Sequence, residues 1–137
     1  MFSEIAPTYD LLNRLLSFGV DQRWRAEAAR TVLAPFAGAA RVRGLDVASG
    51  TGDLTLAIKG VRPDADVMGA DFAEPMLELA RAKAKRRAQD VNFVVADGTD
   101  LPFEDAQFDA VTIAYGLRNF ADPDAGLREF RRVLKPG

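Results

Sequence analysis

The sequence predicts a single α/β domain built around a parallel sheet. Short apolar runs alternate along the chain with segments whose apolar residues recur at helical spacing. This alternation is typical of parallel strands joined by crossover helices. The 137 residues, 48% of them hydrophobic and 28% charged, are enough for one core and exclude a disordered chain. Such sheets bind ligands outside the carboxyl ends of their strands, so functional residues are expected there.

Two helices are expected before the sheet. Apolar residues recur at helical spacing over residues 8–18 and again over residues 22–36, and Gly38 is placed to end the second helix. We therefore divide the single domain into amino-terminal helices, residues 1–38, and an α/β part, residues 42–137.

The α/β part is expected to contain four strands and three helices. The strands span residues 42–48, 66–71, 91–96 and 108–114. The first helix covers residues 53–59 and is broken by Gly60 and Pro63. Pro75 suits the first turn of the second helix, and Asp122 caps the third, which closes near the end of the sequence. The second helix is expected to present one apolar face, made of Met76, Leu77, Ala80 and Ala84.

The chain contains no Cys and no His, and this excludes several classes of site. There can be no disulfide, no thiolate nucleophile, no imidazole base, no His-containing catalytic triad and no Cys- or His-based zinc site. The net charge of −2 argues against nucleic acid as a partner. A basic cluster on the second helix is expected to be a solvated outer face near the carboxyl end of that helix: Arg81, Lys83, Lys85, Arg86 and Arg87.

The first strand ends in a glycine-rich turn that carries the clearest binding signal. Gly50 and Gly52 supply the G-x-G of a dinucleotide fingerprint, but Thr55 stands where its third small residue is expected. Asp46, inside the strand, would repel a pyrophosphate and attract an ammonium group. This combination favours S-adenosylmethionine over a dinucleotide, although many glycine-rich turns are only tight turns.

Two further strand ends carry acids. Asp71 is placed to accept hydrogen bonds from a ribose, and the alternative is a helix cap or a turn residue. Asp97 could accept from an adenine amino group while the backbone of Gly98 donates to the ring. The alternative for this pair is an Asx-turn.

Taken in order, these segments resemble the class I S-adenosylmethionine-dependent methyltransferases: LDVASGTGD, GADF, VADGTDLPF, FDAVTIAYGLRNF and RVLKPG. Two stretches, YDLLNRLLSFGVDQRW (residues 9–24) and GLRN (residues 116–119), resemble more narrowly the ubiquinone/menaquinone biosynthesis C-methyltransferases. The resemblance covers essentially the whole chain. It departs from the family pattern at Leu12, where Met is usual, and at Asp21, where His is usual.

The resemblance implies a Rossmann-like sheet with strand order 3-2-1-4, in which strands 5–7 of the family fold are missing. We therefore expect the chain to be an amino-terminal portion of a longer enzyme that binds cofactor with little or no turnover. Its fourth strand becomes an exposed edge, so dimerisation or domain exchange through residues 108–115 is expected.

The resemblance also assigns the cofactor site residue by residue. Gly50, Thr51 and Gly52 wrap the methionine end of S-adenosyl-L-methionine, and the product is S-adenosyl-L-homocysteine. Asp71 holds the ribose, and Asp97 and Gly98 flank the adenine. Ala114 lies beside the cofactor where the family often has Ser, so it offers only backbone or van der Waals contact.

The same resemblance implies methyl transfer to a ring carbon of a prenylated quinol. Arg118 is the candidate to stabilise the phenolic oxyanion, because its guanidinium stays protonated. Asn119 is expected to orient the hydroxyl. The alternative for Arg118 is a surface salt bridge. Tyr9 and Asp10 are expected to close over the substrate, with Asp10 as proton acceptor. No metal is expected.

Two other functions stay open from the sequence. The chain could belong to a methyltransferase for another small molecule, or to a non-catalytic nucleotide- or NAD-binding module. The first ten residues, MFSEIAPTYD, carry no export signal, and no apolar run is long enough to span a membrane, so a cytoplasmic protein with peripheral membrane contact to its substrate is expected.

Overall fold

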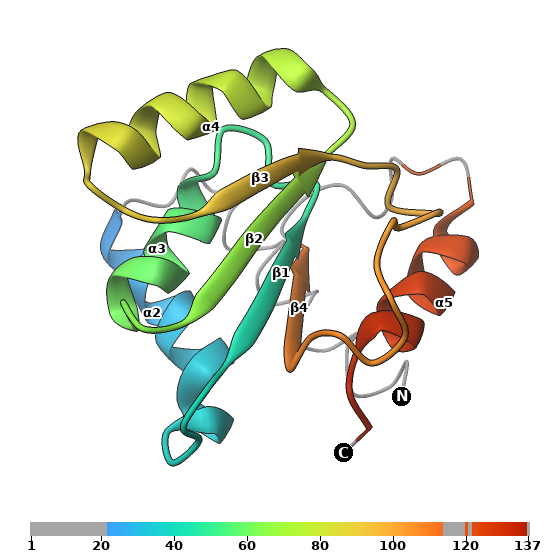
Figure 1. Ribbon diagram of the computed structural model, residues 1–137, viewed down its shortest axis with the longest axis horizontal. Helices are drawn as coiled ribbons and strands as arrows, with labels where there is room; N and C mark the ends of the chain where they lie inside the picture. The colour runs from blue at the N-terminus through green and yellow to red at the C-terminus, as the bar shows by residue number, and fades with distance from the viewer. Residues whose placement is uncertain (1–21, 114–119, 121, 137) are drawn as a thin grey trace.

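The computed structural model describes residues 22–113, 120 and 122–136, with side chains from residue 25 onwards. Its centre is a four-stranded parallel sheet with strand order β3-β2-β1-β4 (Figure 1). The strands are β1 Arg43–Val47, β2 Asp66–Asp71, β3 Asn92–Val95 and β4 Ala110–Ile113. The helices are α2 Gln22–Leu33, η1 Ala34–Phe36, α3 Asp53–Val61, α4 Glu74–Arg86 and α5 Pro123–Val133. The parallel sheet and the strand order expected from the sequence are confirmed.

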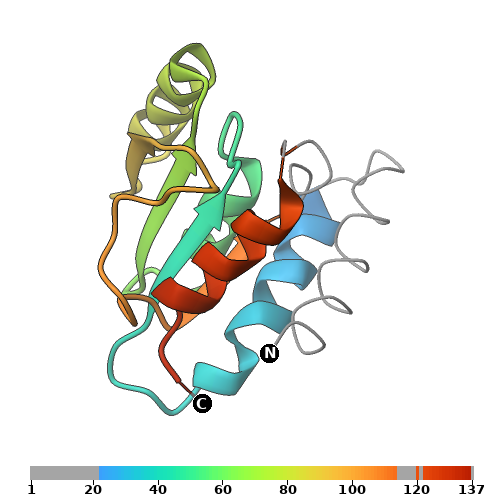
Figure 2. The same ribbon diagram turned by 90° about the vertical axis from the view of Figure 1, so that its right-hand side faces the viewer.

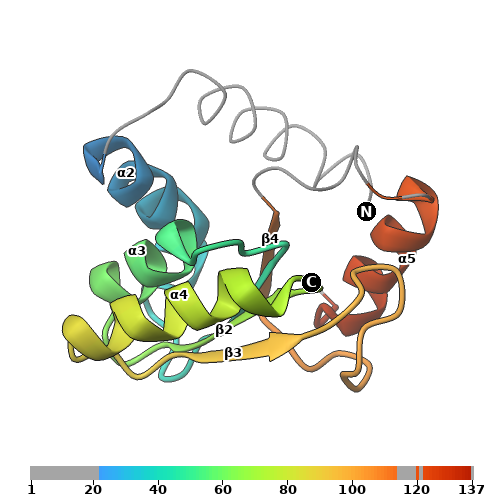
Figure 3. The ribbon, with the colours of Figure 1, turned by 90° about the horizontal axis from the view of Figure 1, so that it is seen from above.

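Side chains alternate between the two faces of the sheet, and each face has its own helical cover. Leu45 and Val47 of β1 pack with Phe130 of α5. On the opposite face, α2 and α3 pack over Val42 and Val67, and α4 packs against β3. In Figure 3, α2, α3 and α4 lie on one side of the sheet and α5 lies on the other. In the view of Figure 2, α5 is in front.

Two helix ends differ from the sequence prediction. α3 runs through Gly60 to Val61, because a glycine costs a helix only about 1 kcal/mol and Pro63 disfavours helical backbone only at the residue before it, Arg62, which is the C-cap. α5 ends at Val133, short of the expected end of the third helix. Beyond it the chain turns to run beside β4, where Phe108 N–H donates to Val133 O at 2.9 Å.

The apolar face predicted for α4 is confirmed only in part. Leu77, Ala80 and Ala84 are buried against β3 and α3, whereas Met76 is 41% exposed. The side chain of Met76 lies one helical position before this face, toward the carboxyl edge of the sheet, where the Met76 methyl group is 3.9 Å from the Cβ position of Gly50.

Arg132 of α5 holds the long connection between β3 and β4. Its guanidinium donates to the carbonyl oxygens of Leu101 and Phe103 at 3.0 and 2.7 Å, and to the carboxylate of Asp105 at 2.8 Å. Glu129 accepts from the same guanidinium and from the backbone N–H of Leu101. The connection that follows Asp97 is thereby fixed to the rest of the domain.

The expected helix over residues 8–18 lies outside the described residues. None of the helices described, α2 to α5, combines the length and hydropathy that a membrane crossing needs.

Candidate functional site

The glycine-rich turn at the carboxyl end of β1 has a left-handed backbone at three positions. The φ angles of Gly50 and Gly52 are +56° and +86°, and Ala48 is at +55°. Glycine adopts this region at no steric cost, which explains the two glycines. Gly52 also forms the N-cap of α3, and a Cβ there would lie 3.0 Å from both Ala80 and the Phe93 ring. The turn therefore packs tightly under α4, as Figure 1 shows.

Asp71 ends β2 and binds this turn directly. Its Oδ2 accepts the backbone N–H of Gly50 at 2.8 Å, and its Oδ1 accepts that of Ala73 at 2.9 Å. Asp71 is only 8% exposed. The sequence placed both features at the carboxyl edge, and the structure brings them into contact.

Asp46 of β1 is buried and bound by two hydroxyl groups. Oδ2 accepts from Thr55 Oγ1 at 2.7 Å, and Oδ1 accepts from Thr112 Oγ1 at 2.9 Å. Burial raises the pKa of Asp46 to about 6, the nearby charge of Asp71 adds to this rise, and the two hydroxyl hydrogen bonds oppose it. Thr55, which departs from the dinucleotide fingerprint, is thus a partner of the acid that the sequence singled out.

Asp97 and Gly98 lie at the end of β3 in an Asx-type turn. Asp97 Oδ1 accepts from the backbone N–H of Thr99 at 2.9 Å and from its hydroxyl at 2.7 Å, and these two bonds hold the Asp97 pKa below its ordinary value. Gly98 is buried against the ring of Phe120 and against Val47, so no side chain fits there. The geometry is that of the Asx-turn alternative, and the bonds to Thr99 occupy only Oδ1 of the exposed Asp97.

Lys83 of α4 belongs to the site, which the sequence did not indicate. Its Nζ donates to Thr51 Oγ1 at 3.0 Å and to Asp53 Oδ1 at 2.6 Å, so it ties α4 to the glycine-rich turn. The interpretation of the whole basic cluster as a solvated outer face is wrong for this residue. A lysine on a crossover helix gives no sequence signal for an inward contact, because only the packing of α4 on α3 directs it.

Two large apolar side chains are exposed near the glycine-rich turn and Asp71. Phe72, which follows Asp71 in the chain, is 81% exposed, and Met76, whose methyl group lies 3.9 Å from the Cβ position of Gly50, is 41% exposed. Apolar surface at the ligand-binding edge of an α/β sheet suits contact with a planar ring. For Phe72 the sequence signal was its position directly after the strand-terminal acid, and Met76 had no such signal.

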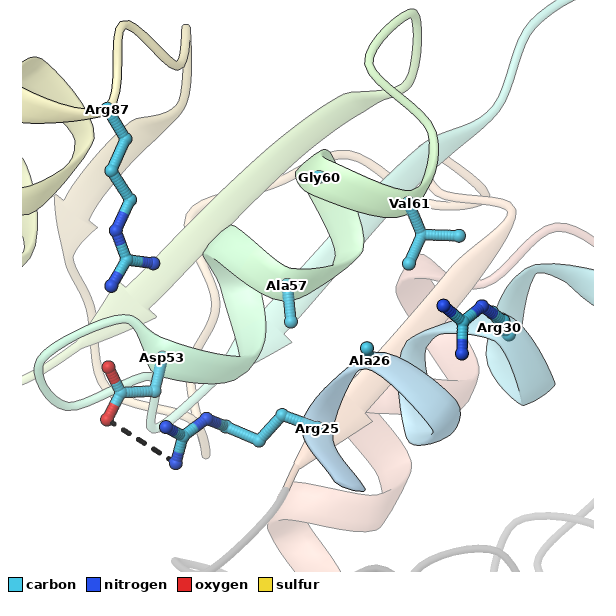
Figure 4. Close-up of a pocket in the computed structure, with 8 residues that line it drawn as sticks. All are labelled: Arg25, Ala26, Arg30, Asp53, Ala57, Gly60, Val61 and Arg87. Carbon is cyan, nitrogen blue, oxygen red and sulfur yellow. Dashed lines mark ion pairs between the residues drawn. The ribbon is translucent and has the colours of Figure 1, made fainter. Parts of the chain in front are cut away.

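A charged pocket of about 610 Å³ lies on the outer face of α3, between α2 and α4 (Figure 4). Arg25 and Arg87 reach toward Asp53 from the two flanking helices, and Arg25 is 4.0 Å from the Asp53 carboxylate. Ala57 and Gly60 form part of its floor. The pocket touches the candidate cofactor site only at Asp53.

Several expected site residues lie outside the described part of the chain: Tyr9, Asp10, Ala114, Arg118 and Asn119. Within the described part, no three or more carboxylates gather in a geometry that could hold a metal ion. The residues that the structure does bring together at the carboxyl edge are Asp46, the glycine-rich turn and Asp71.

Comparison with known proteins gives the family. The sequence model of the ubiE/COQ5 methyltransferase family matches residues 1–137. A demethylmenaquinone methyltransferase from Thermus thermophilus is 58% identical over 137 residues, which are 100% of this chain and 60% of that relative. The ubiquinone/menaquinone biosynthesis C-methyltransferase UbiE of Geobacter sp. is 48% identical over 140 residues, 100% of this chain and 58% of that relative.

A solved structure shares the fold. The SAM-dependent methyltransferase from Aquifex aeolicus superposes with a TM-score of 0.70 at 22% identity, covering 91% of this chain and 68% of that one. The chain spans somewhat over half the length of the two curated relatives. The match over the whole chain shows that it belongs to the ubiE/COQ5 methyltransferase family.

Proposed function

We propose that this chain is the cofactor-binding part of an enzyme that transfers a methyl group from S-adenosyl-L-methionine to a ring carbon of a demethylmenaquinol or a related prenylated benzoquinol. The observation that carries the proposal is the glycine-rich turn held by Asp71, in a chain that belongs to the ubiE/COQ5 family. The named relatives act in menaquinone or ubiquinone biosynthesis by their own descriptions.

The residues present fit this cofactor. The left-handed backbone at Gly50 and Gly52 gives two turn positions without a side chain, where a ligand can approach the main chain. Among the described residues, the buried hydroxyl of Ser49 in the same turn has no hydrogen-bond partner. The polar groups are carboxylates, which accept hydrogen bonds, and hydroxyls and backbone amides, which can donate them, as an amino acid joined to a nucleoside requires.

Each part of the cofactor has a proposed neighbour. Asp71 accepts from the ribose hydroxyls, and its carboxylate is already oriented by two backbone N–H groups. Asp97 and the Gly98 backbone meet the adenine edge, and Phe72 covers its face. Gly50, Thr51 and Gly52 enclose the methionine end, whose ammonium group is drawn to Asp46, and Ala114 gives a van der Waals contact beside it.

When bound, the cofactor supplies a methyl group on a sulfonium, which is already electrophilic. The protein therefore aligns the reactants and stabilises charge. We assign Arg118 to the phenolic oxyanion and Asn119 to the orientation of the hydroxyl. Asp10 takes the phenolic proton, and Tyr9 closes over the ring. Bound there, the cofactor would give its methyl group to the ring carbon, its sulfur would keep the bonding pair, and the proton of that ring carbon would be lost to restore the aromatic ring.

Calorimetry with S-adenosylhomocysteine and with NAD tests the cofactor assignment on the 137-residue chain. We expect a heat of binding with S-adenosylhomocysteine and none with NAD. Binding of NAD instead would favour a nucleotide-binding module.

For turnover, the full-length protein is assayed on demethylmenaquinol with labelled S-adenosylmethionine, where Arg118→Ala is expected to lower kcat by roughly 100-fold or more. Label incorporated only into another small molecule would favour the second methyltransferase hypothesis.

We also propose pairing of two chains through the free edge of β4. β4 pairs with β1 on one side, and on its other side the described residues supply only the bridge between Phe108 and Leu134, so Ala110–Ile113 remain open. An open strand edge favours pairing with another chain. Light scattering at increasing concentration tests this, and a monomer at every concentration would overturn it.

A peripheral contact with a membrane is proposed as the route to a prenylated substrate. Phe72 and Leu79, 81% and 56% exposed, are the two most exposed of the large apolar side chains in the described part of the chain, and they could enter a lipid surface. Co-sedimentation with phosphatidylglycerol vesicles tests the contact. Loss of co-sedimentation in a Phe72→Ser, Leu79→Ser variant is the expected result, and unchanged binding would contradict it.

A further inference from the structure

Asp46 lies where three elements of the domain meet. It sits in β1, it is directly opposite Thr112 in the register with β4, and its second partner, Thr55, is in the first turn of α3. All three side chains are buried, with exposures of 2% for Asp46, 5% for Thr112 and 0% for Thr55.

The two hydroxyls decide the state of the carboxylate. Each donates its proton to a different oxygen of Asp46, at 2.7 and 2.9 Å. A hydroxyl that donates favours the ionised acid, whereas burial and the neighbouring charge of Asp71, at the end of β2, favour the neutral acid. Loss of either hydroxyl would leave one carboxylate oxygen buried without that donor.

The hydrogen bonds also fix the direction of the carboxylate. An ionised carboxylate has about four lone-pair positions, and the two hydroxyls occupy one on each oxygen. The remaining lone pairs can accept from a cation. Gly52, the last residue of the glycine-rich turn, is the N-cap of α3, so Thr55 connects Asp46 to the helix that follows that turn directly.

We infer that Thr55 and Thr112 are positioning residues, which keep the Asp46 carboxylate ionised and oriented toward the cationic amino group of the bound cofactor. The identity of that cation rests on the proposed function. The hydroxyls themselves do not touch the cofactor, and their contribution passes through Asp46.

The first measurement needs no ligand. Carboxyl ¹³C resonances of the 137-residue chain, labelled at Asp, are followed from pH 4 to pH 8. Thr55→Val and Thr112→Val remove one hydroxyl each at nearly constant volume, and each is expected to move the Asp46 midpoint upward by about one pH unit. Thr→Ser at either position keeps the donor and leaves the midpoint in place. Thr31→Val is the matched control, since the Thr31 hydroxyl bonds only to Glu27 O on the exposed face of α2.

The second measurement is the affinity for S-adenosylhomocysteine at pH 6, 7 and 8. Both Val variants are expected to bind about fivefold more weakly than wild type at pH 6, about twofold more weakly at pH 7 and nearly as wild type at pH 8, because a midpoint raised by about one pH unit leaves less of Asp46 ionised at the lower pH values. The Ser variants and Thr31→Val should bind as wild type does. A purely structural defect would lower affinity equally at each pH.

The outcomes separate this inference from the proposed function. If wild type does not bind S-adenosylhomocysteine, the proposed function fails and the inference falls with it. If wild type binds but both Val variants keep the wild-type midpoint and affinity, only the inference is overturned. Circular dichroism checks the fold of every variant, and where Val is not tolerated Thr→Ala removes the same hydroxyl.

Discussion

The backbone N–H of Gly50 donates a 2.8 Å hydrogen bond to Oδ2 of Asp71. The acid that ends β2 therefore holds the turn that follows β1, although the two are 21 residues apart in the chain. Parallel pairing of β1 with β2 brings their carboxyl ends to one edge, and this makes the contact possible. The groups proposed for the ribose and for the methionine end are one connected unit before any ligand binds.

Asp71→Asn is expected to weaken the binding of S-adenosylhomocysteine by about 10- to 100-fold. The amide keeps the size of the carboxylate, but it halves the capacity to accept from ribose hydroxyls and from Gly50. Calorimetry at pH 7 measures the effect. Asp64→Asn is the control, because Asp64 forms only an exposed ion pair with Arg62. Equal affinities for the two variants would contradict the assignment.

The stability of the wild-type chain is expected to depend on Asp46 between pH 4 and pH 6. Its pKa is about 6 in the folded chain, against 3.8 as the ordinary value, so the folded state holds more protons in this window. Stability therefore falls as pH rises, by about 3 kcal/mol from this group at most. Urea unfolding of wild type and Asp46→Asn at pH 4 and pH 7 measures it.

The free energy of unfolding of Asp46→Asn, relative to that of wild type, is expected to increase as the pH rises. A difference in unfolding free energy that is the same at both pH values would come from the altered hydrogen bonds and not from the titration of Asp46. If the difference is the same at pH 4 and pH 7, Asp46 does not titrate in this range.

Lys83→Met is expected to weaken cofactor binding about fivefold, corresponding to about 1 kcal/mol. The variant loses the hydrogen bonds from Nζ to Thr51 and to Asp53, so the glycine-rich turn is less firmly held against α4. Lys85→Met is the matched control, because Lys85 lies on the same helix and is exposed. A similar loss in both variants would indicate a bulk charge effect instead.

Gly69→Ala is expected to lower the free energy of unfolding by about 1–3 kcal/mol. A Cβ at Gly69 would lie 2.5 Å from Cδ1 of the Phe93 ring, which is buried among Leu56, Leu77 and Ala80, so the ring or the backbone would have to shift. Gly44→Ala is the control in the neighbouring strand, where a Cβ meets nothing within 4 Å. That change should leave stability unchanged or raise it by up to about 1 kcal/mol. The midpoints of urea unfolding of the two variants and of wild type, compared at constant m-value, measure both effects.

Much of the fold could be predicted from the sequence because it depends on local patterns. β2 spans residues 66–71 as expected, since a β-branched and small-residue run is bounded by turn residues on both sides. Asp122 caps α5 by accepting from Ala125 N at 3.2 Å, as its place before Pro123 predicted. Boundaries that depend on distant contacts were less accurate, because residues such as Leu134 leave their helix to pair with Phe108.

The sequence by itself determined that a turn rich in glycine follows an acid in a buried strand, and that further acids end the next two strands. Backbone chemistry and periodicity suffice for that. Only the tertiary structure decided which groups those acids meet: Gly50 for Asp71, and Thr55 with Thr112 for Asp46. These partners come from different strands and helices, and only the order and register of the sheet bring them within hydrogen-bonding distance.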